Sequence, residues 1–117
     1  MSLVFISCSI QERDDAIIIK PYPIDYFQIS DVDPSWSPIY LYRYDSTVFS
    51  IIVEGGIPPY TYMWYCGSDE FYRVNKYDDY DIMSYRFDYY GDYIISVIVE
   101  DNCGCTVEYN WMVEVLE

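Results

Sequence analysis

Alternation of apolar and polar side chains near the C-terminus is the feature of this sequence that most restricts its fold. From Thr106 to Val115 one set of alternate positions is apolar and the other is polar, with Met112 as the exception. Successive side chains of a β-strand point to opposite faces, so this period of two predicts a strand with one face in a core. The apolar set is Val107, Tyr109, Trp111, Val113 and Val115.

The segment before this strand predicts its hairpin partner. Residues 101–105 read Asp-Asn-Cys-Gly-Cys, and Gly104 is the glycine that a tight turn between two strands uses. Ile94 and Ile98 are apolar on the face of residues 92–100 where solvent is expected, so we expect the N-terminal segment or a partner to cover them. The other face of this strand carries Tyr93, Ile95, Val97 and Val99.

Short runs of β-type residues fill the rest of the chain. The 16 tyrosines and the many Ile and Val residues favour strands, and no window has a sustained helical period. Short strands at this spacing, with turn signals between them, indicate a β-sandwich or barrel. The expected strands of the later half span 47–54, 60–65, 70–77 and 82–88.

The first 45 residues have a different texture. Four prolines interrupt their short runs, which suits edge strands and extended connections. We expect a single domain in which residues 1–30 form an N-terminal arm or extra edge strands and residues 31–117 form the sandwich. The short runs are 3–10, 16–20, 25–29 and 39–44.

The charge balance excludes several kinds of partner. Twenty acidic against six basic residues give a formal net charge of −14, which repels phosphate backbones, so we expect no nucleic-acid partner. Such acidity suits solubility, and docking onto a basic partner is the functional alternative. No apolar run is long enough to cross a bilayer, so we expect no membrane partner.

The first nine residues faintly resemble the end of a bacterial lipoprotein signal, because a small residue precedes Cys8. A basic region is missing and the apolar part is too short for a signal peptide. We therefore expect these residues to form a strand or arm of the mature protein, and we expect no export signal.

The sequence gives little support for a catalytic function. The chain has no histidine, which excludes His-dependent triads and dyads, and it has no Gly-rich phosphate loop. Two carboxylates could hydrolyse a glycoside, but with 20 acidic residues a pair has no meaning without geometry. We expect a protein that is not an enzyme, with no catalytic residue and no cofactor.

The cysteines and the acidic clusters leave alternatives open. The expected strand order places Cys66 at the far end from Cys103 and Cys105, well beyond the ~7 Å between Cα atoms that a disulfide allows. A Cys-x-Cys pair supplies only two zinc ligands, so we expect structural or free thiols here and at Cys8 rather than a metal site. Acidic clusters at 14–15, 31–33, 78–81 and 101 lack the spacing of a defined calcium loop, and we expect solvated loops.

Two separated motifs carry a family resemblance. Residues 55–64 read Gly-Gly-Ile-Pro-Pro-Tyr-Thr-Tyr-Met-Trp, and Gly91-Asp92-Tyr93 leads through alternating Ile and Val to Asp101-Asn102-Cys103-Gly104-Cys105. This stretch resembles the polycystic-kidney-disease-like (PKD-like) and SprB-type repeats common in surface proteins of Bacteroidota. The likeness covers roughly residues 48–117 and departs at Cys103, where the family often has Asn. It implies an immunoglobulin-like β-sandwich.

The physical roles of the motif residues agree with this resemblance. Gly55 and Gly56 permit a sharp exit from a strand, and Pro58 and Pro59 stiffen the connection. Trp64 is placed to pack between the sheets like the strand-C tryptophan of immunoglobulin-like folds, and Tyr93, near the start of a strand, is placed to tie a corner. The expected core contains Tyr60, Tyr62, Trp64, Tyr93, Ile95, Val97, Tyr109 and Trp111.

Such a module without an export signal suggests an accessory structural protein of a virion. We expect a capsid decoration protein of a bacteriophage infecting Bacteroidota, in contact with the major capsid protein or other virion proteins. The alternative is an adhesion or carbohydrate-binding module at a bacterial cell surface, because exposed tyrosines either form interfaces or stack on sugars such as a host-surface glycan. The expected interface residues are Leu3, Val4, Phe5 and Ile6 of the arm, which would add a strand to a neighbour, with Ile94 and Ile98.

Overall fold

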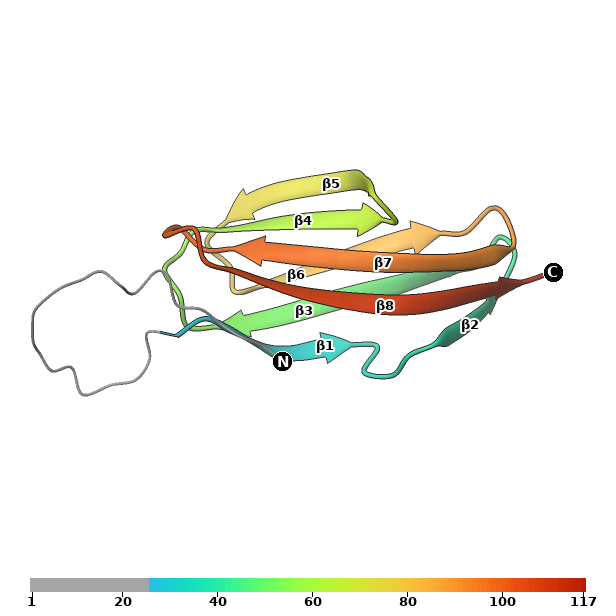
Figure 1. Ribbon diagram of the computed structural model, residues 1–117, viewed down its shortest axis with the longest axis horizontal. Coiled ribbons are helices and arrows are strands. Elements are labelled where there is room, and N and C mark those ends of the chain that lie inside the picture. The colour runs from blue at the N-terminus through green and yellow to red at the C-terminus, as the bar shows by residue number, and fades with distance from the viewer. Residues whose placement is uncertain (1–25) are drawn as a thin grey trace, which may run out of the picture.

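All regular structure in the residues that the computed structural model describes, 26–117, is β-strand (Figure 1). The strands form two stacked sheets, in the orders β1-β3-β6 and β2-β8-β7-β4-β5. The prediction of an all-β, immunoglobulin-like sandwich is confirmed. In chain order the strands are β1 (Gln28–Asp33), β2 (Ile39–Tyr42), β3 (Ser46–Glu54), β4 (Tyr60–Cys66), β5 (Asp69–Lys76), β6 (Tyr80–Arg86), β7 (Gly91–Glu100) and β8 (Thr106–Leu116).

The connection of the first two strands joins the two sheets. β1 pairs antiparallel with β3, whereas β2 crosses to the other sheet and pairs parallel with β8. Strands β3, β4, β6, β7 and β8 then occupy the places of strands B, C, E, F and G in an immunoglobulin sandwich. Because β1 begins at Gln28 and Phe27 is buried, the expected boundary between residues 30 and 31 falls inside β1.

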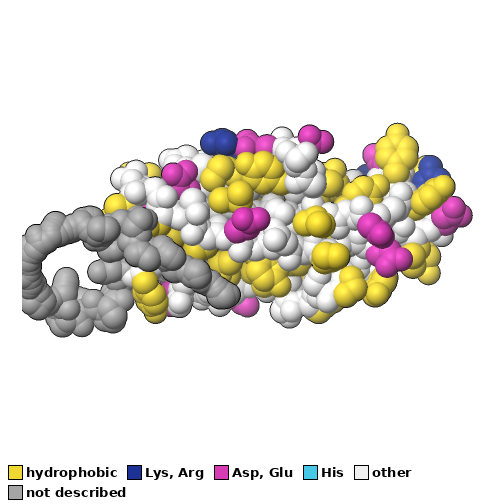
Figure 2. Space-filling model, viewed as in Figure 1, with side chains coloured by type: hydrophobic (Ala, Val, Ile, Leu, Met, Phe, Trp, Pro, Cys, Tyr) yellow, Lys and Arg dark blue, Asp and Glu magenta, His cyan; other side chains and the backbone are white. Residues whose placement is uncertain are grey.

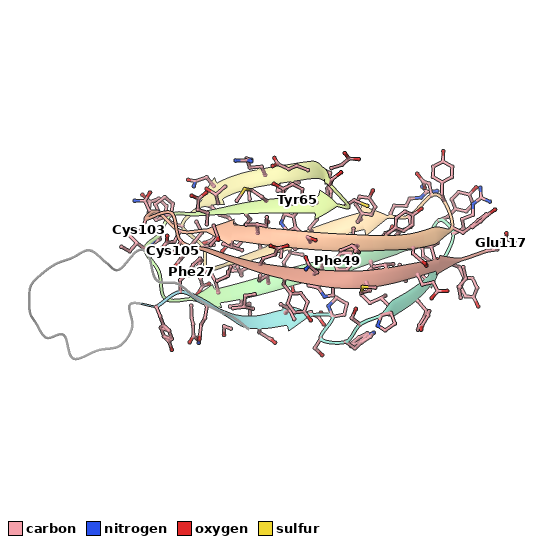
Figure 3. The ribbon with its side chains drawn as sticks, viewed as in Figure 1. Phe27, Phe49, Tyr65, Cys103, Cys105 and Glu117 are labelled. Carbon is pink, nitrogen blue, oxygen red and sulfur yellow. The ribbon has the colours of Figure 1, made fainter. Side chains whose placement is uncertain are left out.

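Aromatic side chains fill the space between the sheets. The indole rings of Trp64 on β4 and Trp111 on β8 are stacked with centroids 6.0 Å apart, and Phe49 of β3 packs on Trp111 at 5.0 Å. All three side chains are fully buried, and Figure 3 shows Phe49 between the two sheets. These rings therefore fill the centre of the sandwich, where burial of their large apolar surfaces stabilises the fold.

Both tryptophan N–H groups have partners in spite of their burial. Trp64 Nε1 donates to Asp81 Oδ2 of β6 at 2.8 Å, which links the two sheets. Lys76 of β5 lies 2.8 Å from the other oxygen of that carboxylate, so the buried charge is paired. Trp111 Nε1 donates to the carbonyl of Pro34 at 2.8 Å and holds the crossing between β1 and β2.

Tyr93 ties the corner at the start of β7. Its hydroxyl donates to the carbonyl oxygen of Tyr89 at 2.6 Å, four residues upstream, which is the arrangement of a tyrosine corner. Tyr93 and Tyr109 are only partly buried, whereas the other expected core residues are buried. Both still pack against the core, Tyr93 on Phe87 and Tyr109 on Trp111.

The two glycines after β3 are required by close backbone approach. Both have positive φ, +79° at Gly55 and +71° at Gly56. A Cβ atom on Gly55 would overlap the carbonyl oxygen of Tyr26, and one on Gly56 would lie 2.8 Å from the ring of Phe27. The loop then passes through Pro58 and Pro59 into β4, so the Gly-Gly pair lets the chain before β1 cross the end of the sandwich.

Substitution of Gly55 tests this role. We expect Gly55→Ala to lower the free energy of unfolding by about 3 kcal/mol or more, because it adds a steric overlap to an unfavourable φ. Gly67→Ala is the matched control, since Gly67 has a similar φ of +62° but open space around the added atom, and should cost only about 1 kcal/mol. Urea unfolding measures both, and equal losses would contradict the proposed overlap.

Candidate binding site

The described residues hold no cluster that suggests catalysis at a metal. Across residues 26–117 no three His, Cys, Asp or Glu side chains gather as they would around a metal ion. No helix in the same range is long and apolar enough to span a membrane. The polar and aromatic groups that could bind a partner lie at the two ends and on the outer faces of the sandwich.

One end of the sandwich is organised by Asp101, at the turn between β7 and β8. Its Oδ1 accepts hydrogen bonds from the backbone N–H groups of Cys103 at 3.0 Å and Cys105 at 2.9 Å. Its Oδ2 accepts from the N–H of Ile57 at 3.0 Å, which fastens the turn to the loop after β3. Gly104, with φ +95°, closes the turn.

Two aspartates correct the expectation of solvated acidic loops. Asp101 is 4% exposed and Asp81 is 6% exposed, and both carboxylates receive hydrogen bonds from groups far away in the sequence. Asp81 points inward because it alternates with the exposed Tyr80 and Ile82 along β6. These side chains are structural, since they satisfy buried N–H groups that would otherwise lack partners.

The cysteines lie at opposite ends, as the expected strand order implies. Cys66 is opposite Ile95, near the beginning of β7, whereas Cys103 and Cys105 follow its other end. Figure 3 shows Cys103 and Cys105 near Phe27 at one end of the sandwich and Glu117 at the other. Cys66 is a free thiol, whereas Cys105 is disulfide-bonded, so the expectation of a thiol is wrong for Cys105. Cys8 lies outside the described residues.

Buried tyrosines have altered proton affinities. Burial raises the pKa of Tyr85 to about 12, and a hydrogen bond with Cys66 adds to the increase. Burial, followed by the charge of Asp81, raises the pKa of Tyr62, whose hydroxyl donates to the carbonyl of Asp78 at 2.7 Å. Burial is the largest single influence on the pKa of the Lys76 ammonium and lowers it, but the hydrogen bond to Asp81 and the charges of Asp81 and Asp78 together outweigh burial, so the pKa is raised.

The opposite end carries a strained tyrosine. Tyr44, in the turn between β2 and β3, has φ +75° and is the one non-glycine residue of the described range with a positive φ. The backbone is fixed there, because Tyr44 N–H donates to the carbonyl of Phe87 at 2.7 Å and Asp45 N–H donates to that of Tyr42 at 3.0 Å. Strain of this kind in a bulky residue gathers at functional sites.

Two arginines flank the ring of Tyr44. The guanidinium carbon of Arg43 lies 4.8 Å from the ring centroid and that of Arg86 lies 5.4 Å from it. Arg43 also donates to the Tyr44 hydroxyl at 2.8 Å, and Arg86 pairs with Asp88 at 2.9 Å. Residues 26–117 contain four basic side chains. Two of these four contact the same exposed ring.

Further exposed tyrosines surround this pair of arginines. Figure 2 shows basic side chains between apolar ones at the end away from the grey segment. Tyr89 is 71% exposed, and its neighbours Tyr42 and Tyr90 are more than half exposed. We call this surface the tyrosine–arginine end, and it comprises Tyr42, Arg43, Tyr44, Arg86, Tyr89 and Tyr90.

The interface residues expected from the sequence lie elsewhere. Ile94 of β7 is 45% exposed on the outer face of the five-stranded sheet, where it is opposite the exposed Met112. Ile98 is partly buried beside Met63 of β4. The arm residues Leu3, Val4, Phe5 and Ile6 lie outside the described residues.

Sequence reasoning did not single out the tyrosine–arginine end. Its tyrosines were noted only as part of a general enrichment, because nothing in residues 42–44 announces a positive φ at Tyr44. Arg43 and Arg86 come together through the antiparallel pairing of β3 with β6, which places Ser46 opposite Arg86. The only signal in the sequence was the scarcity of basic residues. Because they are few, a contact of two of them with the same side chain indicates a candidate functional site.

Comparison with known proteins gives similarity in structure alone. No protein-family model matches the chain, and no curated protein matches it. CopC from Methylosinus trichosporium OB3b has a TM-score of 0.49 and 14% identity, over 77% of this chain and 93% of that chain.

The CARDB domain of PF1109 from Pyrococcus furiosus is similar in two structures. The solution structure has a TM-score of 0.48 and 13% identity, over 77% of this chain and 94% of that chain. The crystal structure of that domain in complex with di-metal ions has a TM-score of 0.47 and 15% identity, over 78% and 94%. At this level of similarity no residue role transfers to this chain.

The raised pKa values predict weakening of the fold at high pH. A group whose pKa is higher in the folded state contributes its full stability below the unfolded pKa and loses it as the pH rises through the folded value. For Tyr85 that window runs from pH 10 to about 12. We expect the urea midpoint to be constant from pH 8 to 9.5 and to fall above pH 10.

Two variants separate Tyr85 from the other tyrosines. Tyr85→Phe should flatten the decline above pH 10, because its phenol no longer ionises preferentially in the unfolded chain. Tyr77→Phe, at a 75% exposed position, should leave the pH dependence unchanged. An equally steep decline in Tyr85→Phe and the parent would contradict this assignment.

Proposed function

We propose that this chain is a non-enzymatic binding and structural module whose tyrosine–arginine end engages a protein partner. The observation that carries the proposal is the exposed Tyr44 ring, held at a positive φ between Arg43 and Arg86. Tyr and Arg are enriched among the residues that dominate binding energy in protein interfaces. Rigid rings in a fixed turn also lose little conformational entropy when a partner binds.

The biological setting that we propose is a virion. In this proposal the chain is a capsid decoration protein of a bacteriophage infecting Bacteroidota, and the major capsid protein or another virion protein is its partner. Support comes from the immunoglobulin-like sandwich, the likeness of residues 48–117 to Bacteroidota-type repeats, and a net charge of −14, which disfavours contact with packaged nucleic acid. Fold does not determine function, so the partner has to be tested directly.

A second candidate function rests on a row of exposed aromatic residues at β2, which shares Tyr42 with the tyrosine–arginine end. Tyr40 and Tyr42 point to the same outer face of β2, about 6.6 Å apart along the strand, and each is more than 60% exposed. Trp36, just before β2, is 61% exposed. Exposed flat rings suit stacking on sugars, so this row favours a carbohydrate-binding or adhesion module of a bacterial cell surface.

Substitution of Tyr44 separates binding from folding. We expect Tyr44→Gly to keep or raise the free energy of unfolding, by up to about 1 kcal/mol, because glycine adopts positive φ without strain. Removal of the ring should weaken binding to phage particles about 30-fold or more, as at an interface hot spot. Binding of labelled protein to particles lacking the chain measures the loss, and urea unfolding measures the stability.

A matched variant distinguishes the two functions. Tyr40→Ala removes an equally exposed tyrosine outside the tyrosine–arginine end, and it should leave particle binding unchanged. On a glycan array, a carbohydrate-binding module would lose its signal with Tyr40→Ala and keep it with Tyr44→Gly. Absence of the chain from the protein content of purified particles would refute the virion setting.

A further inference from the structure

Two acidic side chains lie directly opposite each other on the outer face of the five-stranded sheet. Asp92 of β7 pairs with Glu114 of β8 in the antiparallel ladder, and both side chains are exposed. Like charges at directly opposite positions of a ladder destabilise it. Because this pair works against folding, it is a candidate for a role in binding.

The four basic side chains of residues 26–117 are engaged elsewhere. Three of them form ion pairs with other carboxylates. The fourth, Arg43, donates to the hydroxyl of Tyr44 and to the carbonyl of Asp88. The carboxylates of Asp92 and Glu114 therefore have no basic partner within this part of the chain.

Exposed apolar side chains border the acidic pair on the same face. On one side of the pair, Ile94 lies opposite Met112, and these side chains are 45% and 54% exposed. On the other side, Leu116 of β8 lies beside the exposed Tyr42 of β2. Figure 2 shows acidic side chains among apolar ones over the ends of β7 and β8 away from the grey segment. The surface is therefore apolar around a negative centre.

Aromatic rings extend this surface onto β2 and the loop before it. Tyr40 lies beside Glu114 in the parallel pairing of β2 with β8, and its side chain is exposed. The loop is fastened to the sheet, because Met112 N–H donates to Ser37 Oγ at 2.9 Å. Trp36 directly precedes Ser37 and is also exposed, so a second ring is held near this edge of the sheet. We call this surface the acidic aromatic face, and it comprises Trp36, Tyr40, Asp92, Ile94, Met112 and Glu114.

We propose that the acidic aromatic face binds a linear glycan that carries free amino groups, such as a chain of linked glucosamine units. The rings of Tyr40 and Trp36 stack on the apolar faces of the sugar rings, and the ammonium groups pair with Asp92 and Glu114. An ammonium close to a tyrosine ring gains further attraction from the ring itself. Neutral sugars leave the two carboxylates without a partner, and sugars that carry carboxylate or sulfate groups are repelled by them.

This inference rests on the carbohydrate-binding candidate described above and names its class of sugar, whereas the tyrosine–arginine end plays no part in it. A peptide with lysine side chains also matches the charge of the acidic pair. Asp92 and Glu114 lie on β7 and β8, however, whose backbone groups are already paired on both sides, so a peptide gains no ladder of hydrogen bonds there. Sugar rings need no such ladder, because they bind by stacking and through their polar substituents.

Titration calorimetry of the full chain with matched sugar hexamers tests the proposal. The hexamers of glucosamine, N-acetylglucosamine and glucose share one linkage and differ in a single substituent, which is an ammonium, an acetamide or a hydroxyl group. At a mildly acidic pH, where the amine is protonated, we expect the glucosamine hexamer to bind about tenfold more tightly than the other two, because each surface ion pair adds a few-fold. A hexalysine peptide measures the attraction by charge alone.

Three variants separate the charge from the rings. Glu114→Gln should weaken binding of the glucosamine hexamer about fivefold and leave the other two sugars unchanged. Tyr40→Ala should weaken all three sugars about fivefold or more. Glu108→Gln is the matched control, because it removes the same charge from the same face about 20 Å away along β8, and it should change no affinity. Urea unfolding of Glu114→Gln should show an equal or higher midpoint, since a repulsion is removed.

Four outcomes would overturn the inference. Equal binding of the three sugars, lost in Tyr40→Ala, would refute the selection for amino groups and leave the carbohydrate-binding function standing. Absence of binding by every sugar would refute that function as well. Equal binding of hexalysine and the glucosamine hexamer, unchanged in Tyr40→Ala, would mean that net charge alone attracts them. Tighter binding of hexalysine than of the sugar, lost in Glu114→Gln, would assign this face to a basic protein.

Discussion

The buried hydrogen bond from Trp64 to Asp81 holds the two sheets in register. Trp64 belongs to the five-stranded sheet and Asp81 to the three-stranded one, and Lys76 pairs with the same carboxylate. An unpaired carboxylate at this depth would be costly. The three residues therefore form one unit, and the stacking of Trp64 on Trp111 and of Trp111 on Phe49 depends on its position.

Most of the features that could be predicted from the sequence are set by which face of a strand is buried. Trp111, Val113 and Val115 face the core. When only one face of a strand is buried, alternation of apolar and polar residues determines which side chains point to that face. Tyr93 was identified as a corner residue, and its bond to Tyr89 is local in the chain. Such features depend on neighbours a few residues away, so a single sequence carries them.

The features that were missed depend on distant partners. Asp101 reads as a solvated turn residue until Ile57, 44 positions earlier, is brought against it. Asp81 reads as part of an acidic loop until Trp64 reaches it across the core. The tyrosine–arginine end likewise needs the pairing of β3 with β6 and a positive φ at Tyr44, neither of which local composition encodes.

The parallel pairing of β2 with β8 has a mechanical consequence. Residue 26 enters at one end of the sandwich and Glu117 leaves at the other, while β2 runs alongside β8 in the same direction. Tension applied between these two points pulls β2 and β8 past each other along their length. The hydrogen bonds between them then resist together in shear instead of opening one at a time, which makes this short ladder a clamp against stretching.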